Sequence, residues 1–258
     1  MPEPKVAIVT GAAQGIGRAI ALRLAREGFV LALADVPGAR DKLDGAVAEV
    51  GGRAIAVECD VRHKAEVDAL VAAAVDAFGR LDVMVANAGI APTDTFLDLT
   101  VDAYDTLYAI NQRGVLLCYQ AAARQFIAQG GGGKLIAACS VSGFDTQLHQ
   151  TGYCSTKFAV RSLNQGAARE LGRYGITANV YCPGTVNTPM WQKMDEAFVG
   201  EDGARAPGVL TQRKIDATPL GRIAETEDVA DLVAFLAGPG SNFVSGQAIQ
   251  VCGGEYVT

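Results

Sequence analysis

The sequence predicts an α/β protein: a single domain over residues 1–258, with a doubly wound, parallel seven-stranded sheet and helices on both of its faces. Short apolar segments alternate with segments of helical period from the first residues nearly to the last, a pattern typical of parallel strands joined by helices. The first strand runs directly into a glycine-rich turn, and no internal repeat or low-complexity linker divides the chain. We therefore expect ligands beyond the carboxyl ends of the strands.

The predicted strands are short and rich in branched or small apolar residues. They cover residues 6–10, 30–34, 54–58, 83–86, 134–139, 177–182 and 248–251. Between them apolar residues recur at helical spacing, and residues 104–129 and 152–173 are predicted to form two long helices. The segment at about 187–218 interrupts this alternation, and a segment of that length inside a compact domain is predicted to form a substrate lid.

The composition of the chain limits the kinds of ligand and partner that it can bind. The net charge is −6 and no run of Lys and Arg occurs, so we expect binding to neither nucleic acid nor an anionic membrane. We find no signal-peptide pattern and no apolar stretch of about 18 residues, which predicts a cytoplasmic protein. Six cysteines form no CxxC pair and are predicted to be buried free thiols in a reducing compartment. His63 and His149 have no partners at metal-ligand spacing, so no metal site is expected.

The glycine-rich turn follows the first strand and opens the first helix. It contains Gly11, Gln14, Gly15, Ile16 and Gly17. Glycines let the backbone turn sharply and let a phosphate approach the amides at the helix N-terminus. Any tight strand-to-helix turn can use two glycines, but this position is the one that a dinucleotide requires. The turn therefore predicts pyrophosphate binding and a Rossmann-like sheet.

The second strand ends at Asp35, whose carboxylate is placed to accept hydrogen bonds from the adenosine ribose hydroxyls. The same charge would repel a 2′-phosphate by about 4 kcal/mol at about 4 Å and an effective dielectric constant near 20. Gln14 supplies no cation against that repulsion, and Arg40 is the one nearby cation that could reach the phosphate. The alternative role for Asp35 is a helix N-cap or a turn residue. NAD is therefore predicted rather than NADP.

Tyr153 and Lys157 lie four residues apart, on one face of a predicted helix. A tyrosine with a pKa near 10 needs about 4 kcal/mol of differential stabilisation to exchange protons at pH 7. A neighbouring ammonium and an oxidised nicotinamide would supply it. Alone, this spacing is common in amphipathic helices, so the prediction depends on the other motifs.

Taken together, these motifs resemble the short-chain dehydrogenase/reductase family over essentially the whole chain. Residues 10–17 match the family's T-G-x-x-x-G-x-G, and residues 86–89 match its N-N-A-G except that Ala86 replaces the first Asn. Cys252 stands where the family's V-D-G-G has Asp, and we assign it no function. The resemblance implies a set of cofactor-binding residues: Gly11, Gln14, Gly15, Ile16, Gly17, Asp35, Asp60, Val61, Asn87, Gly89, Tyr153, Lys157, Pro183, Gly184, Val186 and Thr188.

The resemblance also implies a catalytic set of Ser140, Tyr153, Lys157 and Asn111. Ser140 would hydrogen-bond the substrate oxygen and Tyr153 would transfer its proton. Lys157 would bind the nicotinamide ribose and favour the tyrosinate. Asn111 would hold a water that relays protons from Lys157. Alternatively, Ser140 is a turn residue and Asn111 a locally satisfied polar group. Ser142 is a second candidate for the serine, but the spacing to the tyrosine favours Ser140.

The expected reaction is the interconversion of a secondary alcohol and a ketone with NAD(H). Residues 157–161 and 181–191 resemble those of acetoin (2,3-butanediol) reductases, which implies a small vicinal diol or hydroxyketone. Polyol, steroid and terpenoid alcohols stay open as substrates, and a non-catalytic, cofactor-sensing protein is the alternative from another class. Enoyl reduction is disfavoured because enoyl reductases have a longer Tyr–Lys spacing. The predicted pocket residues are Ser142, Phe144, Gln147, His149, Met190 and Trp191.

Assembly is predicted from the two long helices. They contain many small residues, including Ala121–Ala123 and residues 166–168, and expose more apolar surface than one sheet face covers. The family resemblance implies a two-fold four-helix interface and a homotetramer.

Overall fold

The molecule is built on one parallel sheet of seven strands, in the order β3-β2-β1-β4-β5-β6-β7. The computed structural model describes residues 4–51, 53–196 and 206–257. The strands are β1 (Val6–Thr10), β2 (Val30–Asp35), β3 (Ala54–Glu58), β4 (Val83–Ala86), β5 (Gly133–Ala138), β6 (Ile176–Pro183) and β7 (Ala248–Val251). The predicted doubly wound α/β fold in a single domain is confirmed, with strand bounds that shift by one residue at β2, β5 and β6.

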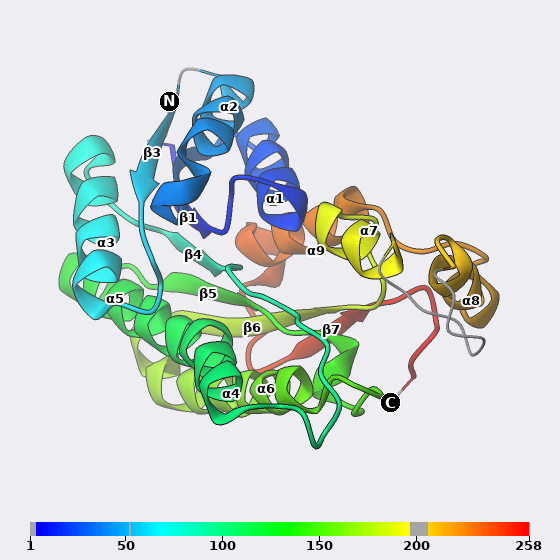
Figure 1. Cartoon of the computed structure of the whole chain (residues 1–258). Coiled ribbons are helices and arrows are strands. Elements are labelled where there is room, and N and C mark those ends of the chain that lie inside the picture. Colours follow the sequence, from blue (N-terminus) through cyan, green and yellow to red (C-terminus); the bar gives the residue numbers. More distant parts are fainter. Residues whose placement is uncertain (1–3, 52, 197–205, 258) are drawn as a thin grey trace.

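Helices cover both faces of the sheet (Figure 1). On one face lie α1 (Gly15–Arg26), α2 (Arg40–Val50) and α9 (Thr226–Ala237). On the other lie α3 (Lys64–Phe78), α5 (Gly114–Gln129) and α6 (Thr151–Leu171). Alternate residues of each central strand enter the two cores: Val6 and Ile8 of β1 pack on the α3 side, Ala7 and Val9 on the α1 side. Burial on both faces explains why these strands are apolar throughout rather than alternating.

The prediction of one unbroken helix over residues 104–129 was wrong in one respect. The helix α4 (Val101–Tyr108) continues through a single π-helical turn, Ala109–Arg113, into α5. Such a turn inserts an extra residue into the helical ladder and often marks a functional site. Here it contains Asn111, which is completely buried.

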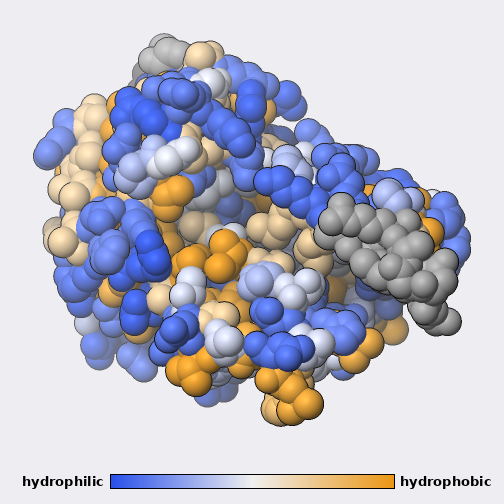
Figure 2. Space-filling model, in the orientation of Figure 1, coloured by the Kyte–Doolittle hydropathy of each residue, from blue (hydrophilic) through white to orange (hydrophobic). Residues whose placement is uncertain are grey.

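The predicted lid segment contains α7 (Pro189–Glu196) and α8 (Val209–Ala217). Its residues 197–205 lie outside the described part of the chain. The two helices project beyond the carboxyl end of β6 (Figure 1). The space-filling view shows a hollow near the middle of this face, beside α7 (Figure 2).

Cys59, Cys118, Cys139, Cys154 and Cys182 are buried free thiols, as predicted, whereas Cys252 is half-buried. Within the described ranges, no helix is long and apolar enough to cross a membrane. Nor does any group of three or more acidic, histidine or cysteine side chains there have the arrangement of a metal site.

The glycine at the start of β5 is predicted to be required for packing. A Cβ at Gly133 would lie 2.4 Å from Cδ2 of Phe126, whose side chain is buried in the core. We expect Gly133→Ala to destabilise the protein by about 1–3 kcal/mol, the usual cost of overpacking. Gly45→Ala is the control, because a Cβ there meets nothing within 4 Å on exposed α2; it should stabilise by about 0.5–1 kcal/mol. Urea unfolding of both variants measures the difference, and equal stabilities would contradict it.

Candidate active site

The glycine turn between β1 and α1 is a cradle made of backbone. Gly11 and Gly15 have φ values of 66° and 56°, in the left-handed region that favours glycine. A Cβ on Gly17 would lie 2.1 Å from the carbonyl oxygen of Gly11, so no other residue fits there. The N-terminus of α1 has no side-chain cap, which leaves its first amides available to an anion.

The end of β4 holds this turn in place. The Asn87 amide donates through Nδ2 to the carbonyl oxygens of Thr10 at 2.9 Å and Gly11 at 3.2 Å. In return, Oγ1 of Thr10 accepts from the backbone N–H groups of Asn87 at 3.0 Å and Ala88 at 3.1 Å. The turn is therefore tied to the sheet by four hydrogen bonds through two side chains.

Asp35 lies beside the turn, as predicted, and its carboxylate is held by backbone rather than by a cation. It accepts from the N–H groups of Ala13 at 3.0 Å and Val36 at 2.9 Å. Arg40 is ion-paired with Asp44 and lies 3.9 Å from Glu58, so its charge is largely compensated. Sequence reasoning missed Lys42, whose Nζ donates to Oε1 of Gln14 at 3.0 Å. Arg40 and Lys42 are two residues apart on α2, about 200° around the helix, and so point to opposite sides of it.

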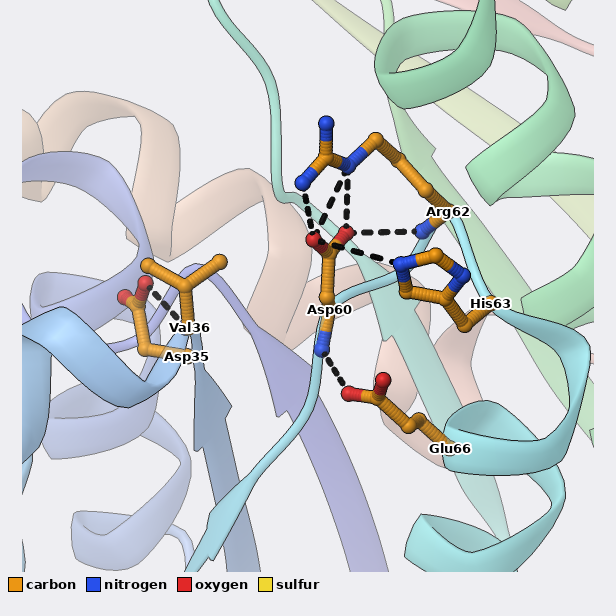
Figure 3. A network of polar contacts seen from close by, with 6 residues as sticks. All are labelled: Asp35, Val36, Asp60, Arg62, His63 and Glu66. Atoms are coloured by element: carbon orange, nitrogen blue, oxygen red, sulfur yellow. Dashed lines mark hydrogen bonds and ion pairs between the residues drawn. The ribbon is translucent and has the colours of Figure 1, made fainter.

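Asp60 belongs to a second polar network at the end of β3 (Figure 3). Arg62 donates to its carboxylate from Nε and from the backbone, and His63 Nε2 lies 3.9 Å from Oδ2. The Arg62 hydrogen bonds hold the pKa of Asp60 below its usual range, although partial burial opposes them. Glu66 accepts from the backbone N–H of Asp60 at 2.8 Å. Val61, next in the chain, is buried against Gly114. Asp60 and Val61 were predicted as site residues, whereas Arg62, His63 and Glu66 were not.

The predicted serine, tyrosine and lysine come from two elements that meet at the carboxyl end of β5. Ser140 follows β5, and Tyr153 and Lys157 lie one turn apart on α6. Nζ of Lys157 is 5.4 Å from the centre of the Tyr153 ring and donates to the carbonyl oxygen of Ala138 at 2.9 Å. Oγ of Ser140 donates to the carbonyl oxygen of Pro183 at 3.4 Å and accepts from Ser142 N–H at 3.1 Å.

Burial sets the protonation of this group. It raises the pKa of Tyr153, and the hydrogen bond with Ser140 partly opposes that rise. Burial also lowers the pKa of Lys157, which is 3% exposed. Both effects follow from the cost of holding a charge away from water. Tyr153 is therefore protonated at neutral pH and able to donate a proton.

Asn111 reaches the same region from the π-helical turn. Its Oδ1 accepts from Ile90 N–H at 2.9 Å, and its Nδ2 donates to the Ile90 carbonyl oxygen at 2.8 Å. A Cβ on Gly89 would lie 3.2 Å from Asn111 Oδ1 and 3.8 Å from Lys157 Nζ, so Gly89 separates the two side chains. The amide of Asn111 thus fixes the loop after β4; its role in a proton relay stays a prediction.

The segment after β6 leads from the sheet to α7 and passes the glycine turn. The N–H of Gly184 donates to the Val251 carbonyl oxygen at 3.0 Å, and Val186 bridges to Ala224. Cγ2 of Thr188 would be 3.7 Å from a Cβ on Gly15. Pro183, Gly184, Val186 and Thr188 therefore line one continuous path from Ser140 to the phosphate turn.

The predicted pocket residues divide into two groups. Ser142 is buried, and Phe144 lies under the Arg161 guanidinium with 3.7 Å between Cζ and the ring centre. Gln147 is half-buried and His149 is exposed, with a φ of 60° that is rare for a residue with a side chain. Arg161 was not predicted; it donates to the Gly143 carbonyl oxygen at 2.6 Å and so holds the turn after Ser140.

Met190 and Trp191 lie on α7, and Met190 is exposed. Nε1 of Trp191 donates to Oγ1 of Thr211 on α8 at 2.9 Å. Asp195, which was not predicted as a site residue, accepts from the N–H groups of Gly208 at 2.7 Å and Thr211 at 3.0 Å. The indole and this carboxylate therefore join α7 to α8, so Trp191 has a structural contact between these two helices.

A nicotinamide dinucleotide fits this site. The Gly17 position leaves no room for a Cβ, and the uncapped α1 provides amides for the pyrophosphate. Asp35 stands where the adenosine ribose would lie, and the Ser140, Tyr153 and Lys157 group lies along the same edge of the sheet. Fold and site thus define an oxidoreductase that uses such a cofactor.

The chain belongs to the short-chain dehydrogenase/reductase family. The family model described as "Enoyl-(Acyl carrier protein) reductase" matches residues 11–255. A short-chain dehydrogenase/reductase of Armillaria gallica is 43% identical over 97% of this chain and 95% of its own length. The (S)-acetoin-forming diacetyl reductase of Staphylococcus epidermidis is 43% identical (97% and 98% covered), and the L-2,3-butanediol dehydrogenase of Corynebacterium glutamicum 40% (97% and 98%).

A solved structure of actinorhodin polyketide ketoreductase with NADPH superposes with a TM-score of 0.92, at 32% sequence identity and over 98% of this chain and 97% of that one. That ketoreductase was solved with NADPH, and two of the relatives named above are a reductase of diacetyl and a dehydrogenase of 2,3-butanediol.

The burial of Tyr153 and Lys157 predicts the pH dependence of the reaction. If Tyr153 is the proton acceptor in alcohol oxidation, kcat/KM for oxidation should rise as pH rises toward the raised pKa of Tyr153. If Lys157 favours the tyrosinate by its charge, Lys157→Ala should move this rise to higher pH by about 1 unit or more. Initial rates of oxidation between about pH 7 and about pH 11, at saturating cofactor, measure the shift. A rise that stays at the same pH in the variant would contradict the assignment.

Proposed function

We propose that this protein interconverts a secondary alcohol and its ketone with NAD(H). One observation carries the proposal: Ser140, Tyr153 and Lys157 lie together at the same edge of the sheet as the glycine turn between β1 and α1. The bound cofactor would supply or accept the hydride. Every other task falls to side chains of this chain.

Each side chain has one task in this proposal. Ser140, fixed by its contacts with Pro183 and Ser142, hydrogen-bonds the substrate oxygen. Tyr153 donates its proton to that oxygen in reduction and removes it in oxidation. Lys157 holds the nicotinamide ribose and favours the tyrosinate by its charge. Asn111, through the loop that it holds after β4, supports a water-mediated proton path to Lys157.

The preference for NAD is proposed from the charges around the adenosine ribose. Asp35 presents a carboxylate oriented by two backbone amides, and the charge of Arg40 is compensated by Asp44 and Glu58. A 2′-phosphate would therefore meet an uncompensated negative charge. Lys42 lies on the Gln14 side of the turn and is the cation that would moderate this repulsion.

The proposed substrate is a small vicinal hydroxyketone or diol, such as acetoin. Two relatives over nearly the full chain carry names for diacetyl reduction and 2,3-butanediol oxidation. The predicted pocket residues agree with such a substrate: Gln147 and His149 offer polar groups for a second oxygen, and Met190 and Trp191 on α7 offer apolar surface. We further propose that residues 187–218 act as the substrate lid.

The test is turnover. We expect the protein to reduce diacetyl or acetoin with NADH at a rate at least about tenfold above that with a polyol or a cyclic ketone, since a pocket contact discriminates by one to two orders of magnitude. Tyr153→Phe should bind NADH and melt as the wild type does while losing turnover by at least about 100-fold. Turnover of none of the three substrate classes, with NADH bound, would favour a cofactor-sensing role instead.

Cofactor choice should depend on Asp35. The double variant Asp35→Ala, Val36→Arg removes the carboxylate and adds a cation at an exposed position. We expect the ratio of kcat/KM for NADH over NADPH to fall by at least about 100-fold. The single variant Val36→Arg is the control, and it should move the ratio less because Asp35 remains. A wild type that uses NADPH as well as NADH would refute the preference.

We also propose a homotetramer in the cytoplasm, for which buried free thiols are suited. Val101, Tyr104 and Tyr108 on α4 and Phe158 on α6 are exposed apolar or aromatic side chains. Apolar groups also gather at the lower edge of the face in Figure 2, over α4. These faces would pair across a two-fold axis. Sedimentation at micromolar concentration should give about four times 26.8 kDa; a monomer would exclude the interface, and Val101→Glu should dissociate it.

A further inference from the structure

Tyr181 makes a contact that neither the proton-transfer group nor the cofactor-binding set includes. It is a completely buried residue of β6 whose hydroxyl donates to Oδ1 of Asn87 at 2.8 Å. Asn87 follows β4, so the side chain crosses over the intervening strand β5. The register partner of Tyr181 on β5 is Ala138, whose methyl group leaves space for the ring. The contact thus joins two strands that are not neighbours in the sheet.

The Asn87 amide has only one orientation that satisfies its surroundings. Its Nδ2 faces the carbonyl oxygens of Thr10 and Gly11, which accept hydrogen bonds and cannot donate them. Its Oδ1 must then face Tyr181, whose hydroxyl is the donor it needs. Asn87 is half-buried. Removing that hydroxyl takes from its Oδ1 the donor that the described structure gives it, and losing a hydrogen bond to a partly buried acceptor costs free energy.

The same amide also sets the space inside the phosphate turn. Nδ2 of Asn87 would lie 2.5 Å from a Cβ on Gly17 and 2.9 Å from a Cβ on Gly11. It therefore packs directly against both glycines whose backbone forms the cradle. An amide that rotates away from the turn would release the carbonyl oxygens of Thr10 and Gly11 and let the two sides of the turn separate.

We propose that Tyr181 is a positioning residue for the phosphate turn: its hydroxyl orients the Asn87 amide, and the amide holds the turn in the form that binds a dinucleotide pyrophosphate. The inference rests on the proposed function, in that it needs a dinucleotide at this turn. Tyr181 acts on binding rather than on proton transfer, because its polar contact is with Asn87 and not with Ser140, Tyr153 or Lys157.

The test compares two hydroxyl deletions at equally buried tyrosines. Tyr181→Phe removes the proposed donor. Tyr119→Phe is the matched control: Tyr119 is also buried, and its hydroxyl bonds Oδ1 of Asn164 and the carbonyl oxygen of Asn179 at 3.3 Å, in the core on the other face of the sheet. Binding of NADH and of ADP-ribose is measured by titration calorimetry, below the melting temperature of each variant. ADP-ribose lacks the nicotinamide and so reports on the phosphate and adenosine ends alone.

We expect Tyr181→Phe to raise the Kd of both ligands by about five- to tenfold, the weight of one buried hydrogen bond, while kcat at saturating NADH stays within twofold. Tyr119→Phe should leave both Kd values within twofold of the wild type. In an Asn87→Ala background, Tyr181→Phe should change the Kd no further, because the amide that it orients is gone.

Four results would overturn the inference: an unchanged Kd in Tyr181→Phe, an equal weakening in Tyr119→Phe, a weakening confined to NADH, or an undiminished effect in the Asn87→Ala background. Failure of the proposed function looks different. A wild type that binds neither NADH nor ADP-ribose would refute the cofactor itself, whereas a wild type that binds both and an unaffected Tyr181→Phe would refute only the role of Tyr181.

Discussion

The structure depends on one constraint: the strands are all parallel, so their carboxyl ends open on the same edge of the sheet. Because of this, the segments that follow different strands become neighbours although they are far apart in sequence. Thr10, Asp35, Asn87, Ser140 and Pro183 each stand at or just after the end of a different strand. The strand order places β1 and β4 side by side at the centre, where successive strands lead away in opposite directions and leave space for a ligand. The position of the site is therefore set by the shared edge of the sheet and not by any single loop.

Different physical effects set the charge of the side chains at the two ends of that edge: burial at one end and hydrogen bonds from backbone amides at the other. Burial raises the pKa of Tyr153 and lowers that of Lys157, and so favours the neutral form of each side chain. Around Asp35 the carboxylate keeps two amide donors and its charge. At Asp60 the donor is the Arg62 guanidinium, and its hydrogen bonds lower the pKa of the carboxyl group. Polarity therefore differs along a single edge, which suits a ligand with a charged end and a reactive end.

The sequence predicted the fold closely because strand and helix signals are local. Branched apolar runs located all seven strands, and the glycine spacing located the turn, because both depend on residues that are neighbours in the chain. The site residues that carry motifs were found in the same way. What it did not predict are contacts between distant segments. Arg161 to Gly143, Asp195 to the start of α8, Lys42 to Gln14 and Tyr181 to Asn87 span from 13 to 94 positions, and no periodicity encodes such pairs. The π-helical turn was missed because its residues, Ala109–Arg113, have ordinary helical propensities.

The π-helical turn Ala109–Arg113 lets the two halves of the long helix, α4 and α5, pack against different neighbours. Each residue advances a helix by about 100°, so one additional residue turns everything before it to a new face. Ahead of it, Leu107 on α4 packs toward Gly152, the residue before Tyr153; behind it, Phe126 on α5 enters the core beside β5. The extra residue therefore lets α4 direct Leu107 toward the start of α6 while α5 keeps Phe126 in the core. The two halves of this long helix thus meet two different sets of neighbours, each with its own register.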